Sequence, residues 1–163
     1  MSLIKPMVSS KSNEWATPKR LFDYLNEEFK FTLDPCSTHE NAKCKNHYTI
    51  EDDGLSKEWE GNVVFINPPY GGHTKQWLEK CRHEAQEHYC VCVLLIVSST
   101  DRSYWHDIIS IHASEIRFMR GRVKFGDSKS TAPFASAIVI FKPNSRRNHP
   151  CKISFVDYRK YHQ

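Results

Sequence analysis

The residues of this sequence best suited to chemistry form the tetrapeptide Asn67-Pro68-Pro69-Tyr70, which directly follows the apolar run Val63–Ile66. β-Branched and aromatic side chains make up this run, and Gly61 precedes it, a pattern that predicts a buried strand of a parallel sheet. The tetrapeptide then lies at the carboxyl end of the strand. Open α/β sheets bind their ligands at that edge, so we expect the active site there.

Asn67 and Pro68 can present two hydrogen-bond acceptors at a fixed separation. The residue before a proline is extended, and Pro68 has a fixed φ and no N–H, so the turn is stiff. The Asn67 side-chain oxygen and the Pro68 carbonyl suit the two N–H groups of a planar base with an exocyclic amine, while Tyr70 stacks on its ring. Accepting both bonds stabilises the positive charge that develops as the amine attacks a methyl donor. We therefore interpret Asn67, Pro68 and Tyr70 as catalytic.

Hydrophobic periodicity places these residues in an α/β fold. A first helix is expected to about residue 29, with Thr17 as its N-cap and Pro18 as its first residue. The eight unbroken apolar residues at 90–97 predict a central strand covered on both faces. Further helices are expected at 74–85 and 103–112, and further strands at 31–33, 47–50, 63–66, 115–119, 136–142 and 152–156. The expected architecture is a Rossmann-like sheet, mostly parallel with an antiparallel late strand.

The length of 163 residues suits one domain, which we expect over residues 14–163 after a flexible arm at residues 1–13. Six cysteines without a C-x-x-C pair, and no signal peptide or long apolar span, predict a reduced, cytoplasmic protein that does not bind membranes. Cys36, Cys44, His39 and His47 have no standard zinc-site spacing, so we expect no metal.

Positive charge is concentrated in the last third of the chain. Residues 1–100 hold 11 Lys/Arg and 14 Asp/Glu, a balance of −3, whereas residues 101–163 hold 12 and 5, a balance of +7. Such segregation suits a polyanion such as DNA. The residues expected to contact phosphates are Arg117, Arg120, Arg122 and Lys124.

Acidic residues follow the two strands expected before the tetrapeptide. Asp34 ends the first of them and can meet a cationic or hydroxyl-bearing cofactor. No G-x-G follows it, which argues against a nucleoside triphosphate. Among the acidic residues 51–53, we favour Asp53 as a contact to ribose hydroxyls or an adenine amine, because it directly precedes the bend at Gly54.

Together, several motifs resemble the phage-type DNA N6-adenine methyltransferases of the Dam class. The resemblance covers roughly residues 14–142, and the tetrapeptide at 67–70 is its most specific part. The motifs are Trp15-x-Thr17-Pro18, Asp34-Pro35-Cys36, Asn41-Ala42-Lys43-Cys44, Asp53-Gly54-Leu55, Asn67-Pro68-Pro69-Tyr70, Gly121-Arg122 and Pro133-Phe134.

This resemblance implies an S-adenosylmethionine-dependent enzyme with a seven-stranded methyltransferase sheet whose last strand is inserted antiparallel. It implies that Trp15, Thr17 and Asp34 lie near the methionine end of the cofactor and Asp53 near its adenosine, with Cys36 as a further cofactor contact. The substrate would be an adenine flipped out of double-stranded DNA, since a stacked amine cannot be reached. Phe134 would join the basic residues in binding DNA, in the cytoplasm of a bacterial host cell and without an obligatory protein partner.

Two features depart from the wider fold, and three other functions stay open. Only 33 positions separate Asp34 from Asn67, too few for the usual helix-strand-helix-strand series, and no glycine-rich turn follows Asp34. The same two acceptors would suit N4-cytosine methylation or methylation of a protein glutamine. A nucleic-acid-binding module without activity is the third alternative, and it would lack affinity for S-adenosylmethionine.

Overall fold

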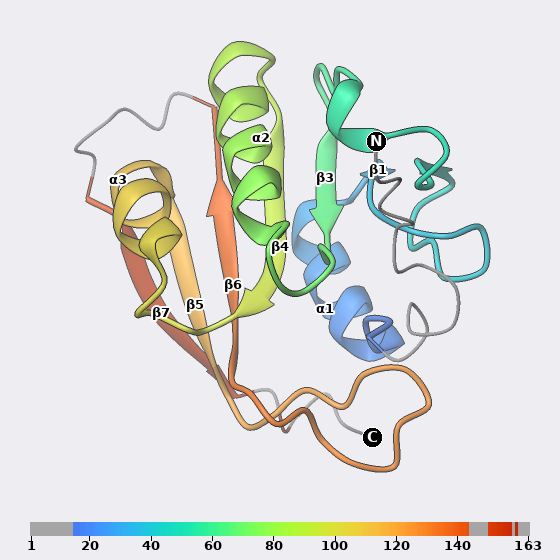
Figure 1. Ribbon diagram of the computed structural model, residues 1–163, viewed down its shortest axis with the longest axis vertical. Helices are drawn as coiled ribbons and strands as arrows, with labels where there is room; N and C mark the ends of the chain where they lie inside the picture. Colours follow the sequence, from blue (N-terminus) through green and yellow to red (C-terminus); the bar gives the residue numbers. More distant parts are fainter. Residues whose placement is uncertain (1–14, 144–149, 158, 160–163) are drawn as a thin grey trace, which may run out of the picture.

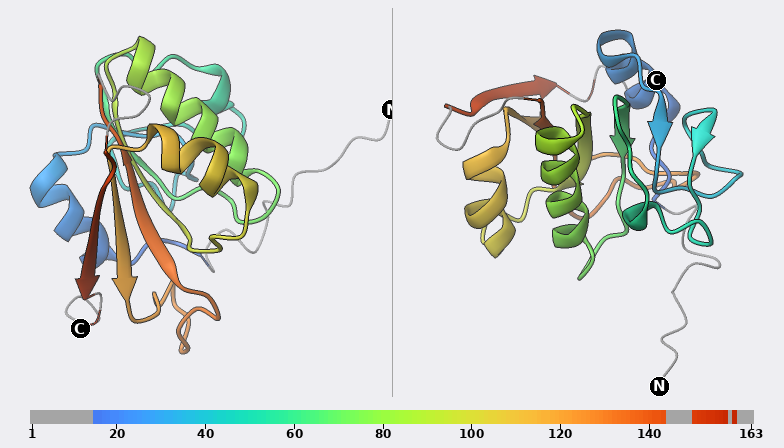
Figure 2. Two further views of the ribbon diagram at one scale, coloured as in Figure 1. Left: turned by 90° about the vertical axis from the view of Figure 1, so that its left-hand side faces the viewer. Right: turned by 90° about the horizontal axis from the view of Figure 1, so that it is seen from above.

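A computed structural model describes residues 15–143, 150–157 and 159, and the arm expected at residues 1–13 lies outside this part. The described residues form a seven-stranded sheet with helices on both faces (Figure 1, Figure 2). The strand order is β2-β1-β3-β4-β6-β5-β7. The strands are β1 (Leu33–Asp34), β2 (Asn46–His47), β3 (Val63–Ile66), β4 (Val91–Val97), β5 (Glu115–Arg120), β6 (Ser136–Phe141) and β7 (Lys152–Asp157).

The sheet is parallel except for one strand. β2, β1, β3 and β4 run parallel to one another, β6 is antiparallel to both of its neighbours β4 and β5, and β7 is parallel to β5. This arrangement confirms the predicted mostly parallel sheet with an antiparallel late strand. It also brings the carboxyl ends of β1, β3, β4 and β5 to one edge, at the bottom of Figure 1 for β3, β4 and β5.

Alternating side chains of the central strands build a core on each face. Helix α1 (Lys19–Phe29) covers one face, and α2 (Thr74–Glu87), the π-helical segment η2 (Trp105–Ile109) and α3 (Ser110–His112) cover the other (Figure 2). Along β3, Phe65 packs in the cluster that contains α1, whereas Val64 and Ile66 pack in the cluster that contains α2. β4 is likewise covered on both faces, as its unbroken apolar run predicted.

Two local predictions were wrong, each because a side chain found another partner. Pro18, not Thr17, occupies the N-cap position of α1, and no side chain caps that helix. β2 ends at His47 rather than at residue 50, because the Asp52 carboxylate accepts hydrogen bonds from the N–H (2.8 Å) and the hydroxyl (3.0 Å) of Thr49 and so closes a turn.

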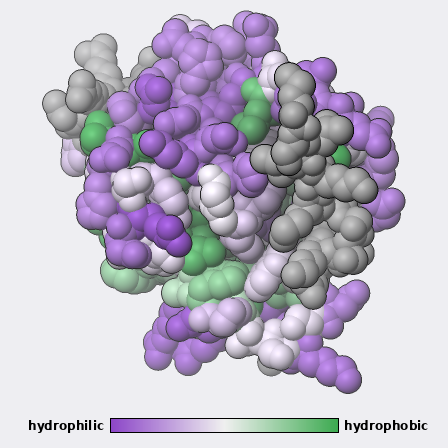
Figure 3. All heavy atoms as spheres, in the orientation of Figure 1, coloured by the Kyte–Doolittle hydropathy of each residue, from purple (hydrophilic) through white to green (hydrophobic). Residues whose placement is uncertain are grey.

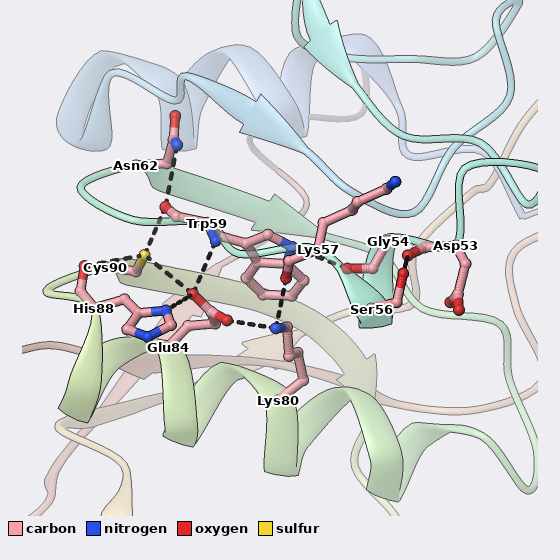
Figure 4. Close-up of polar contacts among 10 residues, drawn as sticks. All are labelled: Asp53, Gly54, Ser56, Lys57, Trp59, Asn62, Lys80, Glu84, His88 and Cys90. Carbon is pink, nitrogen blue, oxygen red and sulfur yellow. Dashed lines mark hydrogen bonds and ion pairs between the residues drawn. The ribbon is translucent and has the colours of Figure 1, made fainter.

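A buried carboxylate on α2 holds the segment that leads into β3 in place by hydrogen bonds. Glu84 of α2 is fully buried and accepts hydrogen bonds from the Trp59 N–H (2.9 Å), from Nδ1 of His88 (3.0 Å) and from the Lys80 ammonium (Figure 4). Burial opposes the charge, but the hydrogen bonds from Lys80, Trp59 and His88 outweigh it and lower the pKa of Glu84. The Trp59 indole also donates to the Gly54 carbonyl (3.0 Å), which ties the 3₁₀ turn η1 (Gly54–Ser56) to this network.

Among the described residues, none of the helices combines the length and the hydrophobicity that a membrane crossing needs.

Candidate active site

Asn67 lies directly beyond β3, and its side-chain hydrogen bonds are made to this end of the sheet. Its Nδ2 donates to the Trp15 carbonyl (2.7 Å) and to Oγ1 of Thr17 (3.0 Å). Its Oδ1 accepts the Tyr70 hydroxyl (3.1 Å). Within the described residues nothing donates to the Pro68 carbonyl. The tetrapeptide therefore presents one unpaired acceptor and one acceptor that a phenol holds.

Tyr70 belongs to an aromatic cluster, which we define as Trp15, Tyr70, Phe125 and Phe134. The Tyr70 ring centroid lies 5.5 Å from that of Trp15, 5.9 Å from Phe125 and 5.2 Å from Phe134. Burial raises the pKa of the Tyr70 phenol, so its hydroxyl stays a hydrogen-bond donor at working pH. An arriving amine must therefore replace or share the bond that Tyr70 makes to Asn67.

A cleft of about 250 Å³ opens beside the aromatic cluster. Its lining residues combine aromatic rings with hydroxyl groups and are Trp15, Phe125, Ser128, Ser130, Thr131, Ala132 and Pro133. A larger cleft of about 380 Å³ lies between α2 and η2, but its lining is mostly charged and the imidazole of His112 is the one ring in it. Stacking needs an aromatic face, so the smaller cleft is the better site for a base.

Asp34 ends β1, which pairs directly with β3. Its buried carboxylate accepts the backbone N–H groups of Lys43 (2.9 Å) and Cys36 (3.3 Å). Burial raises the pKa of Asp34, and these two hydrogen bonds offset the effect only in part. Asp34 therefore shapes the loop that follows β1, and Cys36, whose thiol pKa is also raised by burial, packs beneath it.

Asp53 follows β2 and differs from its neighbour Asp52. Asp52 is occupied by Thr49, whereas the exposed Asp53 side chain makes no hydrogen bond or ion pair within the described residues. Its backbone is left-handed, with φ of 53°. The next residue must be glycine, because a Cβ on Gly54 would lie 2.1 Å from the Pro35 carbonyl oxygen. This contact joins the loops that follow β1 and β2.

The basic residues predicted to contact phosphates do not form one group. Arg117 is buried and donates two hydrogen bonds of 2.7 Å to Glu28 and two of 2.8 and 3.3 Å to Glu115. In this structure Arg117 is therefore not free for the predicted phosphate contact, because Glu28 and Glu115 already neutralise its guanidinium. Arg120, Arg122 and Lys124 are exposed.

These three cations lie at the end of β5 and in the loop that projects at the bottom of Figure 1. The surface there is mostly hydrophilic in Figure 3. Val123 and Phe125 of the same loop are buried, and Phe125 reaches the aromatic cluster. Exposed cations therefore alternate with side chains that pack at the site.

Both the fold and the sequence pattern of this chain are similar to those of known proteins. The described fold matches a protein described as a modification subunit of a type I restriction enzyme from Vibrio vulnificus YJ016, with a TM-score of 0.53 at 13% identity, over 88% of this chain but only 46% of that one. The sequence pattern of the DNA N-6-adenine-methyltransferase (Dam) family matches residues 6–161. The chain belongs to the Dam family.

Two sequence relatives of this Dam-family chain agree with that assignment. A DNA N-6-adenine-methyltransferase of Haemophilus phage HP1 is 29% identical over 144 residues, which span 83% of this chain and 82% of the relative. A protein of Escherichia coli K12 named as a methyltransferase, YfdM, is 37% identical over 65 residues, which span 36% of this chain and 71% of the relative. Family membership makes DNA adenine methylation the activity of this chain.

Sequence reasoning missed two parts of the Dam-family site. Phe125 was not singled out, although the alternation Arg122-Val123-Lys124-Phe125 is a signal that one side of this segment is buried. The hydrogen bond that Asn67 donates to Thr17 was also missed, because it joins residues 50 positions apart. No group of three or more possible metal ligands occurs among the described residues, although Nδ1 of His39 lies 2.9 Å from Nε2 of His47.

Proposed function

We propose that this protein transfers the methyl group of S-adenosylmethionine to N6 of an adenine flipped out of duplex DNA. The observation that carries the proposal is the position of Asn67, whose Oδ1 faces the aromatic cluster at the carboxyl end of β3. Asn67 and the Pro68 carbonyl accept hydrogen bonds from the two N–H groups of the amine, and Tyr70 and Phe134 offer aromatic faces to the base. A base must leave the duplex to reach these groups.

The carboxylates beyond β1 and β2 suit the proposed cofactor. When bound, S-adenosylmethionine supplies a methyl group activated by a positively charged sulfur. A cation near Asp34 favours the ionised form of a carboxylate that burial disfavours, and the free carboxylate of Asp53 can accept hydroxyl or amine donors. Cys36, in the loop after β1, and Trp15, in the segment before α1, are the further residues proposed to contact the cofactor. The six cysteines are free thiols, in keeping with a cytoplasmic enzyme.

The proposal is tested by incubating the protein with unmodified double-stranded DNA and methyl-labelled S-adenosylmethionine, followed by mass analysis of the digested nucleosides. N6-methyl-2′-deoxyadenosine is the expected product. Detection of N4-methyl-2′-deoxycytidine instead would mean that the substrate is cytosine, and label found only in protein would favour glutamine methylation. Cofactor binding without transfer would favour a module that has lost activity, and a lack of both would reject the proposal.

The ring of Tyr70 should matter more than its hydroxyl. Tyr70→Ala should raise KM for DNA through the loss of roughly 1–3 kcal/mol of stacking, whereas Tyr70→Phe keeps the ring and should change KM much less. Steady-state kinetics with DNA and cofactor varied separately measures both effects. Equal damage from the two variants would give the catalytic role to the hydroxyl instead.

Asp53 and Asp52 form a matched pair for the cofactor site. Asp53→Ala should weaken S-adenosylmethionine binding by roughly 1.5–3 kcal/mol, the range for hydrogen bonds to charged groups, since its carboxylate is free to bind. Asp52→Ala removes the bonds to Thr49 and should lower stability with little change in affinity. Isothermal calorimetry and thermal unfolding separate the two. A larger loss of affinity from Asp52→Ala would reverse their roles.

Exposed cations of the projecting loop should contact phosphates. Arg120→Gln with Arg122→Gln should weaken binding to all DNA sequences and lower the salt slope by about 0.9 for each phosphate that is no longer neutralised. Fluorescence anisotropy over a range of salt concentrations measures this slope. Lys30→Gln with Lys57→Gln removes two exposed charges from the segments that lead into β1 and β3 and serves as the control. A normal salt slope in the Arg120/Arg122 variant would mean that DNA binds to another surface of the protein.

A further inference from the structure

The orientation of the Asn67 side chain is imposed from a segment 50 or more positions earlier in the chain. Nδ2 donates to the Trp15 carbonyl (2.7 Å) and to Oγ1 of Thr17 (3.0 Å). A backbone carbonyl can only accept, so a rotated amide would set two oxygens against each other at Trp15. The amide therefore has one favourable orientation, and in it Oδ1 points to Tyr70.

Thr17 has no competing task in the local structure. It is only 3% exposed, and no side chain caps α1, the helix that starts two residues later. Its neighbour Ala16 accepts the Gly126 N–H (2.8 Å), which ties this segment to the projecting loop. Pro18 then restricts the backbone conformation of Thr17. The hydroxyl is therefore held in a fixed place against Asn67.

We propose that Thr17 is a positioning residue for methyl transfer: its hydroxyl, together with the Trp15 carbonyl, holds the Asn67 carboxamide so that Oδ1 faces the target amine. This inference rests on the proposed function and assigns to Thr17 a role on the methyl-acceptor side of the site. The sequence motif alone suggested a cofactor contact. The two roles differ in what they predict, because a positioning residue affects the rate at saturation and a cofactor contact affects affinity.

The chain contains a matched control at the opposite end of the same strand. Thr32 hydrogen-bonds the side chain of Asn62 (2.8 Å) just before β3, as Thr17 hydrogen-bonds that of Asn67 just after it. Thr32→Val and Thr17→Val each delete a threonine–asparagine hydrogen bond at one end of β3, and Thr32→Val also deletes the bond that Oγ1 of Thr32 accepts from the Val63 N–H (3.0 Å). Only one of these bonds lies at the proposed site.

The experiment compares Thr17→Val, Thr17→Ser and Thr32→Val in the full chain. Single-turnover methyl transfer at saturating DNA and S-adenosylmethionine gives the rate, calorimetry gives the cofactor Kd, and thermal unfolding checks the fold. Thr17→Val should lower the rate by about tenfold, the effect of removing one neutral hydrogen bond, and change Kd less than about twofold. Thr17→Ser restores the hydroxyl and should recover most of the rate, and Thr32→Val should leave it unchanged.

Weakened cofactor binding with a normal rate at saturation would make Thr17 a cofactor contact and overturn the proposal. An unchanged rate in Thr17→Val would overturn it as well. Thermal unfolding shows whether an inactive Thr17→Val variant is still folded. If it is folded, nuclear magnetic resonance of the Asn67 side-chain amide tests the proposed cause of the lost activity. That signal, assigned by its loss in Asn67→Ala, should shift and exchange faster in Thr17→Val but not in Thr32→Val, and an unmoved signal contradicts the proposal. A normal rate in Asn67→Ala would reject the proposed acceptor itself, which is a separate failure.

Discussion

Asn67→Ala should lower kcat by on the order of 10²–10³ and leave S-adenosylmethionine binding nearly intact. The Asn67 oxygen is most useful when the attacking amine becomes tetrahedral and positive, so its loss falls on the transition state. The carboxylates proposed to hold the cofactor, Asp34 and Asp53, follow other strands and make no bond to Asn67. Steady-state kinetics and calorimetry with the cofactor measure the two quantities separately.

Asn62→Ala provides the matched control for this prediction. Asn62 precedes β3 and, like Asn67, donates through Nδ2 to a backbone carbonyl, that of Trp59 (3.0 Å), and hydrogen-bonds a threonine. Both variants should lose similar stability, about 1 kcal/mol for each neutral hydrogen bond removed, but only Asn67→Ala should lose kcat. A near-normal kcat in a folded Asn67→Ala variant would show that the amine-acceptor interpretation is wrong.

The central part of the site could be predicted because its signals are local. The run Val63–Ile66 and the prolines after Asn67 sit within a few residues of one another, and each constrains the backbone directly. The parallel strand and the position of the tetrapeptide at its carboxyl end follow from that pattern alone. The family resemblance implied an inserted antiparallel strand, which periodicity does not reveal, but it made that strand the last one. The inserted strand is β6, and the last strand, β7, lies at the edge of the sheet parallel to β5.

The sequence-based expectations differ from the structure where a side chain has a partner far away in the sequence. Thr17-Pro18 fits the local rule for a helix start, yet the Thr17 hydroxyl bonds to Asn67 and leaves α1 without a side-chain cap. Arg117 has other basic residues close by in the sequence, yet its main partner Glu28 lies 89 positions earlier, on α1. Composition counts such a residue as part of a positive surface, although its charge is neutralised in the fold.

Arg117→Met should lower the free energy of unfolding by about 3 kcal/mol, the cost of removing one partner from a buried ion pair. We use the lower end of that range because the Glu28 side chain is 46% exposed and can regain water. Glu115 is only 7% exposed and would keep two longer contacts, the hydrogen bond from the Ser154 hydroxyl (3.4 Å) and the ion pair with Lys152 (3.6 Å). Chemical denaturation measures the loss, and the double variant Glu115→Gln/Arg117→Met should recover part of it because no unpaired buried charge remains.

At acid pH the wild type and Arg117→Met should have nearly the same free energy of unfolding. The hydrogen bond from Arg117 lowers the pKa of Glu28; burial opposes the charge of Glu115, but Arg117 outweighs it and lowers that pKa as well. A carboxyl group with a lowered pKa stabilises the fold above its unfolded pKa and loses this contribution as the pH falls through the folded value. The full difference should therefore appear near about pH 7 and shrink below about pH 4.

Arg117→Met should also leave the salt dependence of DNA binding unchanged, in contrast to the Arg120/Arg122 variant, because a guanidinium already paired with Glu28 and Glu115 releases no counterion from DNA. Anisotropy titrations at several salt concentrations, at a temperature where the variant is folded, test this. A lower slope would mean that the ion pair opens when DNA binds. In that case the sequence-based assignment of Arg117 to the phosphate contacts would be correct for the complex.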